Sequence, residues 1–204
     1  DLLLVRISDL KVDSRKLEIL IKLDFFEEFG GIHYLLTCSD LFSKYYGKKQ
    51  MKKDKALEYG LDFDVLRECS GKETQKTFME LDSAKLLNKL LQNVPNEKTD
   101  MRTKIAYQIE NLGYVDIVDK KLAGYCVALD LNVDYSPRLK LYALANGNII
   151  PVKISKKIFK QNPIRRGDIV KVTNQYKKQK MKKVDGEWQE TDEQEWWVSE
   201  YQIC

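Results

Sequence analysis

The stretch "RLKLYALANGNIIPVKIS", from Arg138 to Ser155, decides the fold of the second half of the chain. Its first seven residues alternate basic or polar side chains with apolar ones, and its last seven form a second, mainly apolar run. Both patterns are typical of β-strands. Between the two runs lies Asn146-Gly147, a dipeptide that favours the tight turn of a β-hairpin. The stretch therefore predicts an antiparallel pair of strands.

Three further segments in the same half of the chain carry strand patterns. "GYCVALDLNVDY" (124–135) precedes the hairpin, and "GDIVKVTNQY" (167–176) and "EWWVSEYQI" (195–203) follow it. A short helical segment, "SKKIFKQNP" (155–163), separates the third predicted strand from the fourth. Three strands, a helical turn and two more strands is the element order of an OB-fold, a five-stranded Greek-key barrel. Other five-stranded β domains share this order.

The first half of the chain carries helix signals instead. "SRKLEILIKLDFF" (14–26) and "IHYLLTCSDLFSKYY" (32–46) have apolar residues at helical spacing, and Ser14 is placed to cap the first of them. The glycine pair of "EFGG" separates these two segments. Further helical patterns follow at 57–71, 81–96 and 99–114.

Charge is distributed unevenly along the chain, whose formal net charge is only +4. From Arg138 to Lys183 there are fourteen Lys and Arg and one acid, Asp168, whereas Val184 to Cys204 holds seven acids and no base. A segregated basic segment is typical of proteins that bind nucleic acids or anionic surfaces. The alternative is a solvated surface hairpin whose lysines are balanced by the acids that follow.

Cysteine, histidine and hydropathy patterns limit the class of protein. The four cysteines show no CxxC spacing and His33 is the one histidine, which argues against a zinc site. No apolar run approaches the roughly 18 residues of a membrane span. Without a secretory signal, reduced thiols and a cytoplasmic location are expected, and no cofactor is indicated. The chain begins without Met, which suggests a fragment or a processed product.

The segment "LEILIKLDFFEEFGGIHYLL" (17–36) resembles the region of bacterial DNA polymerase III alpha subunits that follows the fingers, near their helix-hairpin-helix element. The family form is roughly "LE-x-LIK-x-x-AFD-x-FG", followed by a helix with paired leucines. The matching residues are Leu17, Glu18, Leu20, Ile21, Lys22, Phe25 or Phe26, Phe29, Gly30, Leu35 and Leu36. A second family segment, "LGFYLSGHP", is matched by Leu112, Gly113 and Tyr114 alone, and the rest departs from it.

The resemblance implies an α+β protein with two parts. Residues 1–112 would form a helical region with a helix-hairpin-helix, and residues 113–204 an OB-fold domain, as in the family order. The family's catalytic palm carboxylates lie N-terminal to this region, so the chain would belong to a DNA-directed DNA polymerase, a nucleotidyltransferase, without holding the catalytic site. Other replication proteins would be among its partners.

The expected function is DNA binding, to duplex phosphates through the helix-hairpin-helix and to single-stranded template through the OB-fold. An independent OB-fold protein that binds RNA or tRNA is the main alternative, and a protein-interaction scaffold is a third. Tyr142, Tyr176 and Trp188 are candidates for base stacking, while Trp196 and Trp197 are expected to be structural, one of them in the core. The predicted DNA-binding residues are Gly30, Gly31, Lys44, Lys48, Lys49, Arg138, Lys140, Tyr142, Lys153, Lys156, Lys157, Arg165, Arg166, Tyr176, Lys177, Lys178, Lys180, Lys182 and Lys183.

Overall fold

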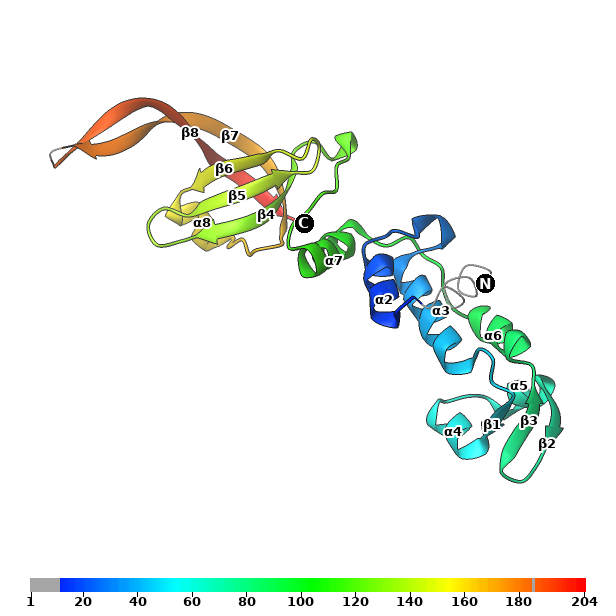
Figure 1. The fold of residues 1–204 in the computed structure, drawn as a ribbon. Coiled ribbons are helices and arrows are strands. Elements are labelled where there is room, and N and C mark those ends of the chain that lie inside the picture. Colours follow the sequence, from blue (N-terminus) through cyan, green and yellow to red (C-terminus); the bar gives the residue numbers. More distant parts are fainter. Residues whose placement is uncertain (1–11, 185) are drawn as a thin grey trace. The chain divides into compact units, whose positions relative to one another are not determined.

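A computed structural model describes residues 12–184 and 186–204 (Figure 1). The chain divides into two compact units: the first ends at Asp100, and the second begins at Met101. We call them unit 1 and unit 2. Each contains both helices and a β-sheet, which confirms the predicted α+β class.

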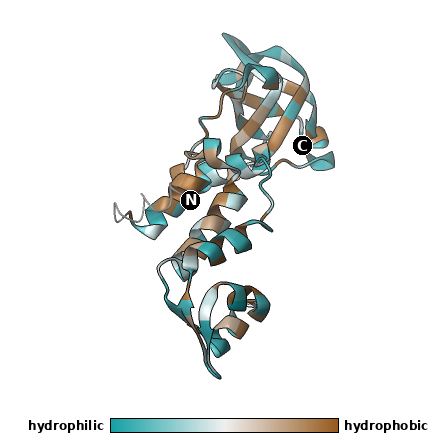
Figure 2. Cartoon of the chain, turned by 90° about the vertical axis from the view of Figure 1, so that its right-hand side faces the viewer, coloured by the Kyte–Doolittle hydropathy of each residue, from teal (hydrophilic) through white to brown (hydrophobic). Residues whose placement is uncertain are grey.

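Unit 1 begins with two helices joined by a short turn. Helix α2 (Ser14–Lys22) is followed by the 3₁₀ helix η1 (Glu27–Phe29) and helix α3 (Ile32–Tyr45). Asp13, and not Ser14, caps α2, because its carboxylate accepts hydrogen bonds from the N–H groups of Arg15 and Lys16. Helices of this unit carry hydrophobic and hydrophilic residues side by side (Figure 2), as expected where one face packs on a neighbour.

A small antiparallel sheet in unit 1 was not predicted from the sequence. Its strands are β1 (Gln50–Lys52), β2 (Ser70–Glu73) and β3 (Thr77–Leu81), in the order β1-β3-β2. Helices α4 (Lys53–Glu58), α5 (Phe63–Glu68) and α6 (Ser83–Leu91) surround it. The region expected to be purely helical therefore has a sheet, whose short strands bury Met51, Phe78 and Leu81 with residues of these helices.

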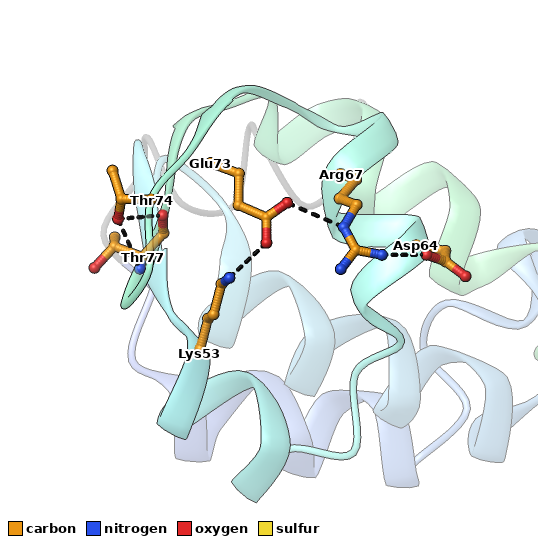
Figure 3. A network of polar contacts seen from close by, with 6 residues as sticks. All are labelled: Lys53, Asp64, Arg67, Glu73, Thr74 and Thr77. Atoms are coloured by element: carbon orange, nitrogen blue, oxygen red, sulfur yellow. Dashed lines mark hydrogen bonds and ion pairs between the residues drawn. The ribbon is translucent and has the colours of Figure 1, made fainter.

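Ion pairs and hydrogen bonds connect the second strand of this sheet to its helices (Figure 3). The Glu73 carboxylate lies 2.5 Å from Lys53 Nζ and 3.0 Å from Arg67 Nε, and Arg67 also contacts Asp64 at 2.5 Å. The hydrogen bond from Lys53, and then that from Arg67, lowers the pKa of Glu73. The network links α4 and α5 to β2 and is a structural feature of unit 1.

Unit 2 is built on a closed five-stranded sheet. After helix α7 (Met101–Leu112) and the 3₁₀ helix η2 (Lys120–Leu122) come β4 (Tyr125–Asn132), β5 (Arg138–Ala143) and β6 (Ile149–Ile154). Helix α8 (Lys156–Gln161) then leads to β7 (Ile169–Val184) and β8 (Glu187–Ile203). The strand order is β4-β5-β6-β8-β7, and β7 pairs with β4 to close the barrel. All pairs are antiparallel except β6 with β8.

The last two strands continue far beyond the barrel as a two-stranded ribbon (Figure 1, orange and red). Strand β7 pairs with β4 only over Ile169–Lys171, and β8 pairs with β6 only over Trp196–Val198. Beyond these residues β7 and β8 pair with each other, out to Val184 and Glu187. Residues 177–184 and 187–194, which lie between the two strand segments predicted from the sequence, are therefore strand as well.

Two apolar clusters hold unit 2 together. The first fills the barrel, with Leu139, Leu141, Val152 and Ile154 among its members. The second lies on the outer side of β4 and β5 and contains Ile105, Val115, Val127, Tyr142, Leu144 and Ile169. Because Ile105 belongs to α7, this helix covers one side of the barrel.

The domain boundary consequently differs from the predicted one. The prediction placed it between residues 112 and 113, after α7, but the compact units separate before this helix. Arg102 of α7 also donates a hydrogen bond to the carbonyl of Cys204. Helix α7 is therefore part of unit 2. No helix in the described part of the chain is both long and apolar enough to cross a membrane.

Candidate nucleic-acid interface

A groove of about 790 Å³ lies on unit 2, where the loop between β4 and β5 meets β6 and the β7–β8 ribbon. Three cations, one carboxylate and three aromatic rings are among its lining side chains. The lining residues are Tyr135, Ser136, Arg138, Lys153, Lys178, Gln179, Met181, Trp188, Glu195 and Trp197.

Strand pairing explains why residues distant in the sequence meet in this groove. Arg138 of β5 is paired with Lys153 of β6, and Lys153 is paired with Trp197 of β8. Lys178 of β7 is paired with Glu195. Paired residues on neighbouring strands have side chains on the same face of the sheet. The register of the three ladders therefore gathers the charges on one surface.

Glu195 is the most constrained of these charged side chains. Its Oε2 lies 2.5 Å from Lys153 Nζ, and its Oε1 accepts a hydrogen bond of 2.9 Å from Trp197 Nε1. The side chains of Lys153 and Glu195 are 22% and 17% exposed, so this ion pair is less hydrated than a pair on the open surface. Lys153 and Lys178 also lie 5.6 and 5.7 Å from the Trp197 ring centre, within the range of a cation–π contact.

Two of the aromatic side chains are strongly exposed. Tyr135, in the loop after β4, is 81% exposed, and Trp188, near the end of the ribbon, is 66% exposed. Exposed aromatic rings beside cations are the elements with which proteins hold single-stranded nucleic acids, because every base can stack on a ring. The groove thus combines stacking surfaces with positive charge.

The ribbon as a whole is not a basic loop, contrary to what its lysines suggest. Lys180 pairs with Glu193 at 2.5 Å, and Lys177 lies 5.0 Å from the Trp196 ring centre. The hydrogen bond from Lys180 lowers the pKa of Glu193. Strand β7 carries six lysines and β8 carries six acids: Lys171, Lys177, Lys178, Lys180, Lys182 and Lys183 against Glu187, Glu190, Asp192, Glu193, Glu195 and Glu200. The number of lysines in β7 therefore overstates the positive charge that the ribbon offers to a ligand.

Tyr142, a candidate for base stacking, does not have the exposed position that stacking requires. Its side chain does point away from the barrel interior, but it is 6% exposed, because the second apolar cluster covers it. Burial, and then the charge of Asp116, raises the pKa of Tyr142. A covered ring cannot stack on a base, so the prediction for Tyr142 is wrong. Trp196 packs against the barrel core, as expected for one of the pair, whereas Trp197, which was also expected to be structural, lines the groove.

The other predicted residues of unit 2 lie outside the groove. Lys140 is paired with Asp130 at 3.1 Å, and its hydrogen bond lowers the pKa of Asp130. Tyr176 is 48% exposed on the ribbon. The remaining residues lie on α8, in the loop before β7 and along the ribbon; they are Lys156, Lys157, Arg165, Arg166, Lys182 and Lys183, all exposed.

The glycine turn of unit 1 has its backbone donors engaged within the unit. The N–H of Gly31 donates to Asn96 Oδ1 at 3.0 Å, and the N–H of Ile32 donates to Thr99 Oγ1 at 2.8 Å. The N–H of Gly30 donates to the Glu27 carbonyl. A phosphate would have to displace these acceptors, so the structure does not present the free donors that the predicted role of Gly30 and Gly31 requires.

The predicted lysines near this turn differ in their surroundings. Lys44 Nζ lies 2.7 Å from the Asp40 carboxylate on α3, an ion pair between exposed side chains. Lys48 and Lys49 are exposed in the connection between α3 and β1. Both are positioned to meet an anion from solvent, without a built site around them.

Close packing at Gly31 gives a first testable prediction. A Cβ atom at this position would lie 1.9 Å from the Glu97 carbonyl oxygen, although Gly31 has an ordinary φ of −69°. We expect Gly31→Ala to destabilise unit 1 by about 1–3 kcal/mol or more, because the backbone at Gly31 or at Glu97 would have to move. At Gly47 (φ +73°) a Cβ would meet nothing, so Gly47→Ala should cost only the roughly 1–2 kcal/mol of a left-handed backbone. Thermal denaturation of the two variants compares the costs, and a Gly31→Ala protein as stable as the parent would contradict this packing.

Sequence reasoning missed several residues of the groove. Tyr135 and Ser136 lie in the loop after the first strand of unit 2, which is a binding loop in OB-folds. That position was a usable signal, although no residue in the loop was singled out. Glu195 and Gln179 carried no such signal, because only the strand register shows that they line the groove.

Acidic and thiol side chains do not gather at a metal site in the described residues. There, no group of three or more His, Cys, Asp or Glu side chains is placed to hold a metal ion. Cys38, Cys69 and Cys126 are buried, and burial raises the pKa of each thiol. Buried protonated thiols are poor nucleophiles and poor ligands.

Comparisons of the chain with models of protein families, with curated proteins and with solved structures found no match. The features from which a function can be proposed are the cations and exposed rings of the groove and its position on the closed sheet.

Proposed function

We propose that unit 2 is an OB-fold domain. Three features support this: the strand order β4-β5-β6-β8-β7, the helix α8 between the third and fourth strands, and the parallel pairing of the third strand with the fifth. In OB-folds, ligands bind on the second and third strands, between the loop after the first strand and the connection between the fourth and fifth. The groove has this location: Tyr135 lies in the loop after β4, and Trp188 lies at the start of β8, next to the connection from β7.

The function we propose is binding of single-stranded DNA in this groove. The observation that carries the proposal is that two exposed rings, Tyr135 and Trp188, line the same groove as Arg138, Lys153 and Lys178. Stacking of bases on such rings contributes about 1–3 kcal/mol per base, and cations along the groove neutralise phosphates. Duplex DNA keeps its bases stacked inside the helix, so this chemistry favours single strands.

The proposed setting is a bacterial replicative DNA polymerase, as the C-terminal DNA-binding portion of a DNA polymerase III alpha-like subunit. The resemblance of residues 17–36 supports this setting, and so does the order of a helix-rich unit followed by an OB-like one. In this setting the groove holds template strand. Contact with duplex phosphates is assigned to the exposed Lys48 and Lys49, since the glycine turn has its N–H groups engaged.

Salt dependence tests the role of the groove cations. Arg138→Gln with Lys178→Gln should weaken binding of a single-stranded 12-mer and flatten the slope of log K against log salt by about 1.4, because each phosphate that is no longer neutralised accounts for about 0.7. Lys156→Gln with Lys157→Gln removes the same charge from α8, outside the groove, and should leave the slope nearly unchanged. Equal effects of the two double variants would show that charge acts only through the overall field.

A competition with RNA of the same sequence separates this function from its alternative. If the RNA binds the groove more tightly than the DNA, the chain is an independent RNA-binding OB-fold protein. Tighter binding of single-stranded DNA than of either RNA or duplex DNA supports the polymerase setting.

A further inference from the structure

We infer that Glu195 makes the groove selective for bases that carry an exocyclic amino group, namely cytosine, adenine and guanine, over thymine and uracil. This inference rests on the proposed binding of single strands. It adds a sequence preference, which stacking on Tyr135 and Trp188 alone would not produce, because stacking tolerates every base.

A carboxylate in a groove for nucleic acid is unexpected, because it repels phosphates. Glu195 nevertheless lines the groove with three cations around it. Its own ion pair with Lys153, at 2.5 Å, neutralises the cation that it contacts. Phosphates are therefore expected to follow Arg138 and Lys178, and the bases to face the Lys153–Glu195 pair.

The Glu195 carboxylate has capacity for a further hydrogen bond. An ionised carboxylate offers roughly four acceptor sites. Lys153 and Trp197 each supply one donor. These two contacts also hold the side chain in place, so that a base meets an oriented acceptor and not a mobile one.

Gln179 also lines the groove, but its Oε1 atom is buried and has no hydrogen-bond partner among the described residues. Because this atom has no contact with solvent, it is not open to a base in this structure. The acceptor that the groove offers to a base is therefore the Glu195 carboxylate, whose side chain is 17% exposed.

The remaining acceptor capacity of the Glu195 carboxylate favours some bases over others. The cytosine N4 amino group donates to Glu or Asp carboxylates in nucleic-acid complexes. Thymine and uracil carry a carbonyl oxygen at the equivalent position, and a carbonyl facing a carboxylate is repelled. The inference is sharpest for cytosine against thymine, because the two pyrimidines have similar size and stack similarly.

The test uses the full chain and fluorescein-labelled dC12 and dT12 at pH 8, where both oligonucleotides are single strands. The parent chain should bind dC12 about fivefold or more tightly than dT12, as expected of about 1 kcal/mol of discrimination. Glu195→Gln should bind both more tightly, since Lys153 loses its partner, and the preference for dC12 should fall to near one. Asp130→Asn breaks the comparable Lys140–Asp130 pair outside the groove and should leave the preference unchanged.

A modified ligand gives the same test without any change to the protein. A 12-mer of 2-pyrimidinone nucleotides lacks the 4-amino group of cytosine, and the parent chain should bind it no more tightly than dT12. Equal binding of dC12 and dT12, an unchanged preference in Glu195→Gln, or full affinity for the 2-pyrimidinone oligomer would each overturn the role of Glu195. These three outcomes would leave the proposed binding of single strands unaffected. If neither dC12 nor dT12 binds at low salt, the proposed function fails and the selectivity fails with it.

Discussion

A fragment of residues 101–204 is expected to fold on its own, whereas a fragment of residues 113–204 should not reach a stable fold. The shorter fragment lacks α7 and with it Ile105, which is 1% exposed. Without this helix, Val127, Tyr142 and Leu144 lose their cover. Each such side chain contributes about 1.5–3 kcal/mol when buried. The loss is comparable with the whole stability of a domain, roughly 5–15 kcal/mol.

Chemical denaturation followed by far-UV circular dichroism measures this difference. The longer fragment should unfold cooperatively with a mainly β spectrum. Ile105→Ala in the longer fragment is the graded control and should cost about 2–5 kcal/mol, as for other large-to-small changes in a core. A fragment of residues 113–204 as stable as residues 101–204 would contradict the assignment of α7 to unit 2.

The exposed rings of the groove give the second large effect. Tyr135→Ala and Trp188→Ala should each weaken binding of a single-stranded 12-mer by about 1–3 kcal/mol, or roughly 5- to 150-fold, because a base loses its stacking partner. Neither ring is buried, so the stability of unit 2 should hardly change. Fluorescence anisotropy in a fixed salt concentration measures the affinities.

Tyr114 provides the matched control for these two variants. It is 55% exposed and does not line the groove. Tyr114→Ala should therefore leave the affinity as it is in the parent. If Tyr135→Ala and Trp188→Ala behave like Tyr114→Ala, bases do not stack in the groove.

The architecture of unit 2 was largely predictable from local pattern. Alternation of apolar residues and the Asn146-Gly147 turn located β5 and β6, and similar patterns located β4 and parts of β7 and β8. The length of the last two strands was not predictable in this way. Their polar halves pair with each other and not with a core, so they lack the apolar periodicity that identifies a strand.

The small sheet of unit 1 was missed for a related reason. Its strands are three to five residues long, and the pattern of so short a segment does not separate strand from helix. Phe78 and Leu81 are buried in β3, yet "TFMEL" also fits one helical turn. Tertiary packing against α4, α5 and α6 decides between the two.

The candidate site was predictable in kind but not in detail. The basic character of residues 138–183 indicated a binding surface, and Arg138, Lys153 and Lys178 do line the groove. Which lysines are neutralised depends on the partner strand, as the Lys180–Glu193 pair shows. Tyr142 was misplaced because alternation predicts the direction of a side chain relative to the barrel and not what covers it.

A titration of the full chain with a labelled single-stranded DNA 12-mer of mixed sequence tests the central claim most directly. It is run at about 50 mM salt beside the matching duplex and beside a chain that carries Tyr135→Ala, Arg138→Gln and Trp188→Ala together. We predict saturable binding of the single strand by the parent, weaker binding of the duplex, and loss of single-strand binding in the triple variant. Parent and triple variant binding the single strand equally, or neither binding it at all, would contradict a single-strand site in the groove of unit 2.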